Sequence, residues 1–144
     1  MLSNTSKYAI RAVIYLALNG EKDKKIGIKQ ISKELDIPTP FLGKILQSLA
    51  KHKLLASTKG PHGGFSLGKK PTEISLMDIV EIIDGLDSFN MCVLGLSTCT
   101  DNEANCPIHA SYSTIREQLK NLFQTENVGV LVDKIKGSEK QLVL

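Results

Sequence analysis

The chain has 144 residues, of which 42% are hydrophobic and 23% charged, a composition typical of one globular domain with some appended structure. Its apolar stretches are far shorter than the roughly 20 residues that span a bilayer, and the N-terminus lacks the pattern of a secretion signal. These features argue against a membrane or secreted protein, so we expect a cytoplasmic protein without a membrane partner.

The basic residues are concentrated in the first half of the chain. Residues 1–70 contain 13 Lys or Arg and 4 Asp or Glu, a net charge of +9. Residues 71–144 contain 5 Lys or Arg and 11 Asp or Glu, a net charge of −6. A basic half favours a polyanionic partner such as nucleic acid, although a solvated lysine-rich surface would give the same count.

Three helices are predicted in the first 51 residues. Apolar residues recur at helical spacing over residues 8–18, and the same pattern predicts a short helix over residues 28–35. A third helix is expected over residues 39–51, with Thr39 as its cap and Pro40 at its first position. Two short helices joined by a tight break predict a helix-turn-helix.

A hairpin and a fourth helix follow. Residues 54–58 and 64–67 are strand candidates, and the basic, turn-rich sequence KGPHG at residues 59–63 joins them. A helix is predicted over residues 74–83, with Ser75 as its cap. A basic hairpin directly after a helix-turn-helix indicates a winged helix, so the expected fold is mainly α with a small β-hairpin wing.

All three cysteines lie in a polar loop of 24 residues, at residues 84–107. Loops of this length in compact domains are usually functional or disordered. Cytosolic proteins seldom form disulfides, and an odd number of cysteines cannot pair completely within one chain. The pattern therefore favours metal ligation by Cys92, Cys99 and Cys106.

The spacing of the candidate ligands argues against zinc. Zinc sites usually use pairs separated by two to four residues, whereas here six residues separate each cysteine from the next, and His109 follows Cys106 after two. A binuclear iron–sulfur cluster takes four protein ligands, of which His can be one, so a [2Fe-2S] cluster with His109 as the fourth ligand is favoured. Alternatively, His109 packs at the start of the next helix, and Asp101 and Glu103 are weaker ligand candidates.

A long helix after the loop has a narrow apolar seam. Its members are Tyr112, Ile115, Leu119, Leu122 and Phe123. A seam of this width is typical of a helix that pairs with another, which favours a homodimer, although packing on the same domain is the alternative. Thr125 is expected to cap a final short helix that extends to residue 135, and the tail at 137–144 is expected to be loose.

The sequence resembles the Rrf-type winged-helix transcription regulators, including their IscR-like, cluster-bearing members. The resemblance extends from residue 6 to about residue 132. It is carried by SKYAIRA at residues 6–12, the helix-turn-helix, KGPHGGF at residues 59–65 and the three-cysteine loop. The combination of wing and cysteines in this order is specific, whereas neither alone would suffice.

The resemblance implies a homodimer that pairs through the long C-terminal helix and carries a [2Fe-2S] or [4Fe-4S] cluster on the three cysteines. In the IscR-like branch a histidine three positions after the last cysteine completes the site, as His109 would. Gly43 stands where some members have a discriminating glutamate, and residues 7–9 lack the carboxylate ligand of the NsrR branch. His62 replaces a wing glycine common in the family.

The implied partner is double-stranded promoter DNA, with the third helix in the major groove and the wing in the minor groove. The candidate phosphate contacts are Lys7, Lys29, Lys44, Lys51 and Lys59. The candidate base contacts are Thr39, Lys44, Gln47 and Ser48. Pro61 and Gly63 are expected to shape the wing tip, and any single lysine in this set can instead be a solvated surface residue.

These interpretations divide the chain into a DNA-binding domain (1–84), a sensor loop (85–107), a dimerisation helix with a following short helix (108–136) and a tail (137–144). The predicted function is a transcription regulator that senses cluster or redox status, with the cluster-assembly machinery as a donor. Two alternatives are a regulator of the same fold with a thiol switch or zinc, and an iron–sulfur carrier without a DNA role. No catalytic motif indicates an enzyme.

Overall fold

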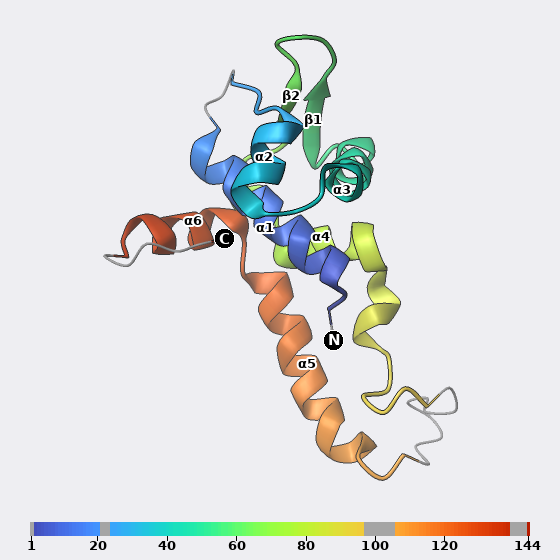
Figure 1. Ribbon diagram of the computed structural model, residues 1–144. Helices are drawn as coiled ribbons and strands as arrows, with labels where there is room; N and C mark the ends of the chain where they lie inside the picture. Colours follow the sequence, from blue (N-terminus) through green and yellow to red (C-terminus); the bar gives the residue numbers. More distant parts are fainter. Residues whose placement is uncertain (1, 21–23, 97–105, 139–143) are drawn as a thin grey trace.

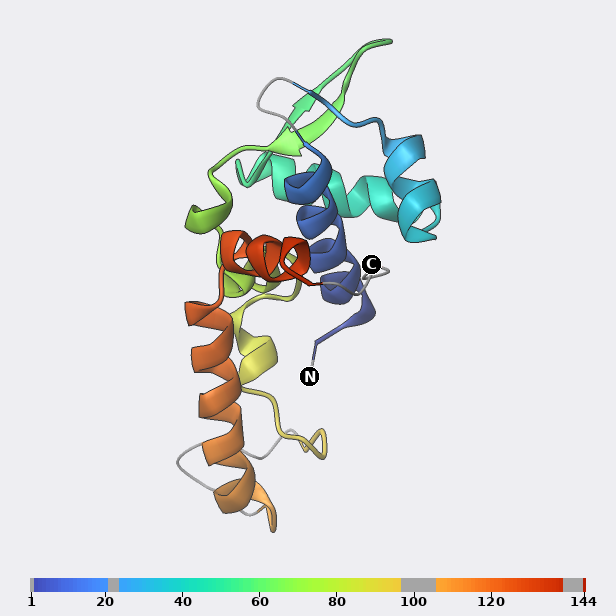
Figure 2. The same ribbon diagram turned by 90° about the vertical axis from the view of Figure 1, so that its left-hand side faces the viewer.

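The computed structural model describes residues 2–20, 24–96, 106–138 and 144. A helical body with a two-stranded wing stands at one end, and one long helix extends away from it (Figures 1 and 2). The winged-helix fold predicted from the sequence is confirmed. Within the described residues, no helix is long and apolar enough to cross a membrane.

Helix α1 (Asn4–Asn19) runs through the centre of the body, where it contacts α2, α3, α4 and α6. It begins at Ser3, whose side chain accepts a hydrogen bond from the Ser6 N–H. Its apolar positions are almost completely buried because other elements surround it; these are Ala9, Ala12, Val13 and Leu16. Burial of this kind, rather than helix propensity, stabilises the element.

The helix-turn-helix consists of α2 (Ile28–Leu35) and α3 (Thr39–Lys51), as predicted. Asp36 ends α2 in the left-handed conformation (φ 53°), which Asp tolerates better than most residues. The prediction that Thr39 caps α3 was wrong. The Thr39 hydroxyl instead donates to the Ser32 hydroxyl (3.0 Å), which donates to the Ile37 carbonyl (2.6 Å), so the threonine fixes the turn between the helices.

The wing pairs β1 (Leu55–Thr58) with β2 (Gly64–Leu67) in antiparallel register, with Leu55 opposite Leu67. Ile26 adds an isolated bridge to Phe65, with both backbone hydrogen bonds at 2.9 Å. This bridge fastens the root of the wing to the segment that leads into α2.

Helix α4 (Leu76–Asp84) follows the short 3-10 turn η1 (Pro71–Glu73). Ser75 and Asp78 form a reciprocal capping box, so the helix begins two residues later than predicted. The predicted structureless loop begins with another 3-10 turn, η2 (Leu86–Phe89). Phe89 is buried there and meets Phe123 edge to face, with ring centroids 5.4 Å apart.

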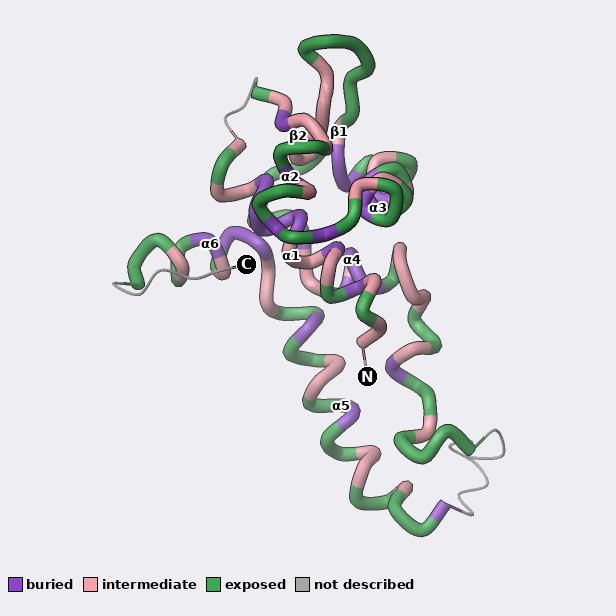
Figure 3. Tube along the Cα trace, in the orientation of Figure 1, coloured by how far each residue is buried: buried purple, intermediate pink, exposed green. Residues whose placement is uncertain are grey.

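Helix α5 (His109–Thr125) is the long helix that leaves the body, and most of its surface is exposed (Figure 3). Helix α6 (Val128–Lys136) turns back and packs against α1 and η1. Val128 and Val132 thereby enter the main core. The segment called DNA-binding domain in the sequence therefore shares its core with α6.

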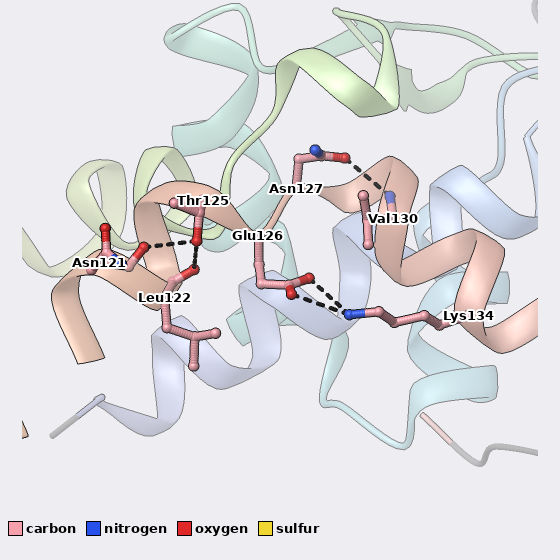
Figure 4. A network of polar contacts seen from close by, with 7 residues as sticks. All are labelled: Asn121, Leu122, Thr125, Glu126, Asn127, Val130 and Lys134. Carbon is pink, nitrogen blue, oxygen red and sulfur yellow. Dashed lines mark hydrogen bonds and ion pairs between the residues drawn. The ribbon is translucent and has the colours of Figure 1, made fainter. Parts of the chain in front are cut away.

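The corner between α5 and α6 is held by a local polar network (Figure 4). Asn127 caps α6 by accepting the Val130 N–H (3.0 Å), and Glu126 forms an ion pair with Lys134 (3.1 Å). The predicted cap, Thr125, was wrong because its hydroxyl donates to the Asn121 carbonyl at the end of α5 (2.9 Å).

Backbone hydrogen bonds attach this corner to the body. The Leu76 N–H donates to the Glu126 carbonyl (3.0 Å), and the Val128 N–H donates to the Ile74 carbonyl (2.9 Å). In the tail, residues 139–143 lie outside the described residues, whereas Leu144 is half-buried against the main core.

Candidate functional site

Two regions bear on function, the surface of α3 with the wing and the segments around the cysteines. Figure 1 shows α3 and the wing at the same end of the molecule, with the cysteine segments near the far end of α5. We describe the basic end first.

Most of the α3 residues predicted to contact DNA are exposed. Lys44, Gln47 and Lys51 are exposed, and Ser48 is partly exposed. Their spacing places them on the side opposite the buried leucines of the helix. Thr39 is only partly exposed and is engaged by Ser32, so it is less accessible than the sequence suggested.

The wing tip exposes Lys59 and Pro61 at the turn between the strands. Gly60 has φ +106°, and the Gly63 N–H donates to its carbonyl (2.9 Å). A Cβ on Gly63 would lie 2.1 Å from the Thr58 carbonyl oxygen, so the turn requires glycine there. Lys59 is thus held on a compact and well-defined tip.

Replacing Lys59 with alanine is expected to weaken DNA binding and to reduce its salt dependence. Each phosphate contact contributes a slope of about 0.9 in log K against log salt, so the slope should fall by about one per subunit, or about two for a dimer on its operator. The check is binding measured by fluorescence anisotropy between low and physiological salt. Lys136→Ala, an exposed lysine on α6, is the matched control. An unchanged slope in Lys59→Ala would place the wing away from the DNA.

The start of α1 is fastened to the end of α4. The Ser3 hydroxyl and N–H both donate to the Asp84 carboxylate, at 2.6 and 3.2 Å. Partial burial alone would raise the pKa of Asp84, but these hydrogen bonds outweigh it and hold the pKa below its usual 3.8. Asp84 therefore links α1, which presents the exposed Lys7, to the element that leads into the cysteine region.

Replacing Asp84 with asparagine is expected to lower the free energy of unfolding at neutral pH. Since the folded state depresses the pKa, the carboxylate contributes stability above pH 3.8 and loses it as pH falls through the lowered value. The difference between wild type and variant should therefore shrink in acid. Urea unfolding at pH 7 and at successively lower pH measures it, and a difference independent of pH would contradict the ionised contact.

The two described cysteines meet. Cys92 is half-buried, Cys106 is buried, and their Sγ atoms lie 3.7 Å apart. A tetrahedral metal with metal–sulfur bonds of about 2.3 Å holds two thiolate sulfurs about 3.8 Å apart. The pair therefore has the spacing of two thiolate ligands on one metal atom. Cys99, Asp101 and Glu103 lie outside the described residues.

His109 is the first residue of α5 and is half-buried. The backbone N–H of His109 donates to the backbone carbonyl of Cys106 (3.1 Å), which ties the start of the helix to the cysteine. Within the described ranges, however, no three His, Cys, Asp or Glu side chains are grouped as a metal site requires. The role of His109 as the fourth ligand stays a prediction.

Two basic residues of α5 hold the segment that precedes Cys92. Arg116, only 7% exposed, donates to the Asn90 carbonyl (3.4 Å), and Lys120 donates to the Asn90 side chain (3.4 Å). Sequence analysis missed both, because nothing in the polar spacing of the helix distinguishes a basic residue that is buried from one in solvent. They bring positive charge to the segment that precedes Cys92.

The predicted apolar seam of α5 divides into two groups. Phe123 is buried against its own chain with Met77, Val80 and Phe89, and Leu119 packs beside that cluster. Ile115 and Leu122 are instead 58% and 48% exposed, whereas Tyr112 is half-buried.

A further exposed apolar residue precedes the helix. Ile108 is 41% exposed, and with Ile115 and Leu122 it repeats every seven residues. Sequence analysis did not include it, although this heptad spacing was the available signal. These three residues, termed the α5 stripe, form an unpartnered apolar line on the described part of the chain.

Comparisons with known proteins agree with this arrangement. The family model of Rrf2, described as an iron-dependent transcriptional regulator, matches residues 2–134. An HTH-type transcriptional regulator of Aquifex aeolicus is 34% identical, with 92% of each chain covered. The regulator IscR of Cronobacter sakazakii is 27% identical over 92% of this chain and 80% of its own.

Solved structures with the same fold include CymR, the global cysteine regulator of B. subtilis. It superposes with a TM-score of 0.76 at 20% identity, covering 93% of this chain and 97% of its own. T. potens IscR superposes with a TM-score of 0.72 at 19% identity, covering 99% and 93%. A family match along nearly the whole chain, together with a basic helix-turn-helix and wing, identifies a DNA-binding regulator and not an enzyme. The chain belongs to the Rrf2 family of transcriptional regulators.

Proposed function

We propose that this protein is a homodimeric regulator whose affinity for promoter DNA depends on an iron–sulfur cluster bound by Cys92, Cys99, Cys106 and His109. The observation that carries the proposal is the 3.7 Å separation of the Cys92 and Cys106 sulfurs. It suits two thiolate ligands of one tetrahedral metal, and the family match to iron-dependent regulators agrees with it.

The four candidate residues fit such a group chemically. Three thiolates and one imidazole are an accepted donor set for a [2Fe-2S] cluster. Arg116 and Lys120 hold the segment that precedes Cys92 through their contacts with Asn90. The cluster, when bound, supplies a redox-sensitive and iron-dependent cross-link of the loop. The assembly machinery remains a proposed donor, and a cytoplasmic location is part of the same proposal.

The chain itself offers a route from the cysteines to the DNA surface. Asn90, two residues before Cys92, is held by α5, and Asp84 holds Ser3 at the start of α1. Binding of a cluster by the cysteines would therefore act on both the long helix and the helix that presents Lys7. DNA affinity changes to the extent that the two loop states differ in affinity for DNA.

The proposed dimer pairs two copies of the α5 stripe. Large apolar side chains with this exposure on one helix face are typical of a protein–protein interface. A two-fold pair would present two α3 helices to successive half-sites of one operator.

Anaerobic purification followed by absorbance, iron and sulfide measurements tests the cluster. We expect a coloured protein with about two irons and two sulfides per chain, the content of a [2Fe-2S] cluster. DNA binding is then compared between loaded and metal-free protein. A protein that stays colourless after anaerobic reconstitution, yet binds DNA, contradicts cluster sensing and leaves the regulator intact.

A thiol switch is the second candidate function, because the same two sulfurs are already in contact. Hydrogen peroxide would oxidise the Cys92 and Cys106 thiols to a disulfide with release of two waters, after the sulfurs close from 3.7 Å to about 2.05 Å. Peptide mapping without reductant would detect this link. Its formation in metal-free protein, together with a change in DNA binding, favours this function over the cluster.

A further inference from the structure

The first turn of α3 carries a large apolar residue on its outer surface. Phe41 is 38% exposed, whereas the other large apolar residues of the helix, Leu42, Ile45, Leu46 and Leu49, are at most 3% exposed. Phe41 begins the line that continues through Lys44, Ser48 and Lys51 at spacings of three, four and three residues. It therefore borders the same surface as the predicted DNA contacts.

The ring of Phe41 is held in place from one side. It meets the Tyr8 ring edge to face, with centroids 5.8 Å apart and an interplanar angle of 88°. The Arg11 guanidinium lies 5.6 Å from the Tyr8 ring centre and donates to the Leu35 carbonyl (2.9 Å). Contacts among α1, α2 and α3 thus fix the ring before any ligand binds.

We propose that Phe41 is a specificity-determining residue that packs against the methyl group of a thymine in the major groove. The N-terminal residues of a recognition helix are those that reach base edges, and the thymine methyl is the apolar feature of that groove. A ring that is already fixed loses little conformational entropy on contact. The inference rests on the DNA-binding function and adds an apolar readout to the hydrogen bonds expected from the other candidate base contacts.

The expected effect follows from the size of one methyl group. Removing it should weaken binding about fourfold per contact, equivalent to about 0.8 kcal/mol for one buried methylene-sized group. The loss of affinity on removing the methyl group should occur only when the Phe41 side chain is present. Removing the methyl and truncating Phe41, separately and together, therefore forms a double-mutant cycle.

The test uses full-length protein and duplexes selected by it from a random-sequence pool. Each thymine of a selected duplex is replaced in turn by deoxyuridine, which removes only the methyl group. We expect about a fourfold loss at one or two positions per half-site with wild type, and no loss at those positions with Phe41→Ala. Phe41→Leu should retain part of the loss. Val130→Ala, equally exposed at 38% but on α6, should behave as wild type.

Because the thymine-to-deoxyuridine ratio is taken within each variant, a partly unfolded preparation does not alter it. If Phe41→Ala weakens binding to both duplexes equally, the residue only supports the helix and the proposal is overturned. It is also overturned if no thymine shows a methyl effect with wild type. If the wild-type protein retains no duplex from the pool, the DNA-binding function itself is wrong. Failure of the Phe41 proposal alone leaves DNA binding intact, so the two outcomes can be distinguished.

Discussion

Replacing Ile115 and Leu122 together with glutamate is expected to convert the proposed dimer into a folded monomer. The two side chains are 58% and 48% exposed in the single chain, so the isolated fold does not depend on them. In a two-fold interface the change introduces four carboxylates where apolar surface was buried. At about 1 to 2 kcal/mol for each, the dissociation constant of the dimer should rise at least about a thousandfold.

Sedimentation velocity over a range of protein concentrations measures this change, and circular dichroism verifies that the helices persist. Val130→Glu is the control, since it places one glutamate at an exposed apolar position outside α5, and each single variant, Ile115→Glu or Leu122→Glu, matches it in charge. The monomer should also lose operator affinity, because it presents one α3 instead of two. A double variant that remains dimeric would show that the copies pair elsewhere.

The second large effect is expected from Cys106→Ala. This thiolate has one of the ligand positions in the proposed site, so its removal leaves too few ligands for a binuclear cluster. Iron, sulfide and visible absorbance should fall to background after anaerobic reconstitution. His52→Ala, which removes an exposed imidazole remote from the cysteines, should keep the full content.

Because Cys106 is only 7% exposed, loss of the cluster must be distinguished from loss of the fold. Thermal unfolding of the metal-free variant provides this check, and Cys92→Ala repeats the experiment at a half-buried position. A complete cluster in either variant would remove that cysteine from the ligand set.

Sequence periodicity predicted the elements of the body well, because their apolar positions are those the core buries. Prediction of helix caps failed where a threonine hydroxyl could form a hydrogen bond with more than one partner. Thr39 and Thr125 both looked like helix caps, but each bonds to a neighbouring turn or helix instead. Such choices depend on tertiary geometry and are invisible to local propensity.

The candidate site was likewise predicted in part. The exposed lysines of α3 and the wing follow from charge and helical spacing, but the exposure of Phe41 and the burial of Arg116 do not. Phe41 has the same apolar character as its buried neighbours, and only its contact with Tyr8 shows why it stays near the surface. The sequence likewise did not decide whether Phe123 packs against a second copy or against its own chain. Its contact with Phe89 shows that it packs against its own chain.

The position of α6 has a consequence for how the chain is made. Val128, fully buried, and Val132 fill the core beside α1, although more than a hundred residues separate them from that helix in sequence. During synthesis α1 leaves the ribosome more than a hundred residues before α6, so the core has an open side until α6 is made. Closure of the core must therefore await α6, and a nascent chain stalled in the cysteine region would expose apolar surface that can aggregate or bind chaperones.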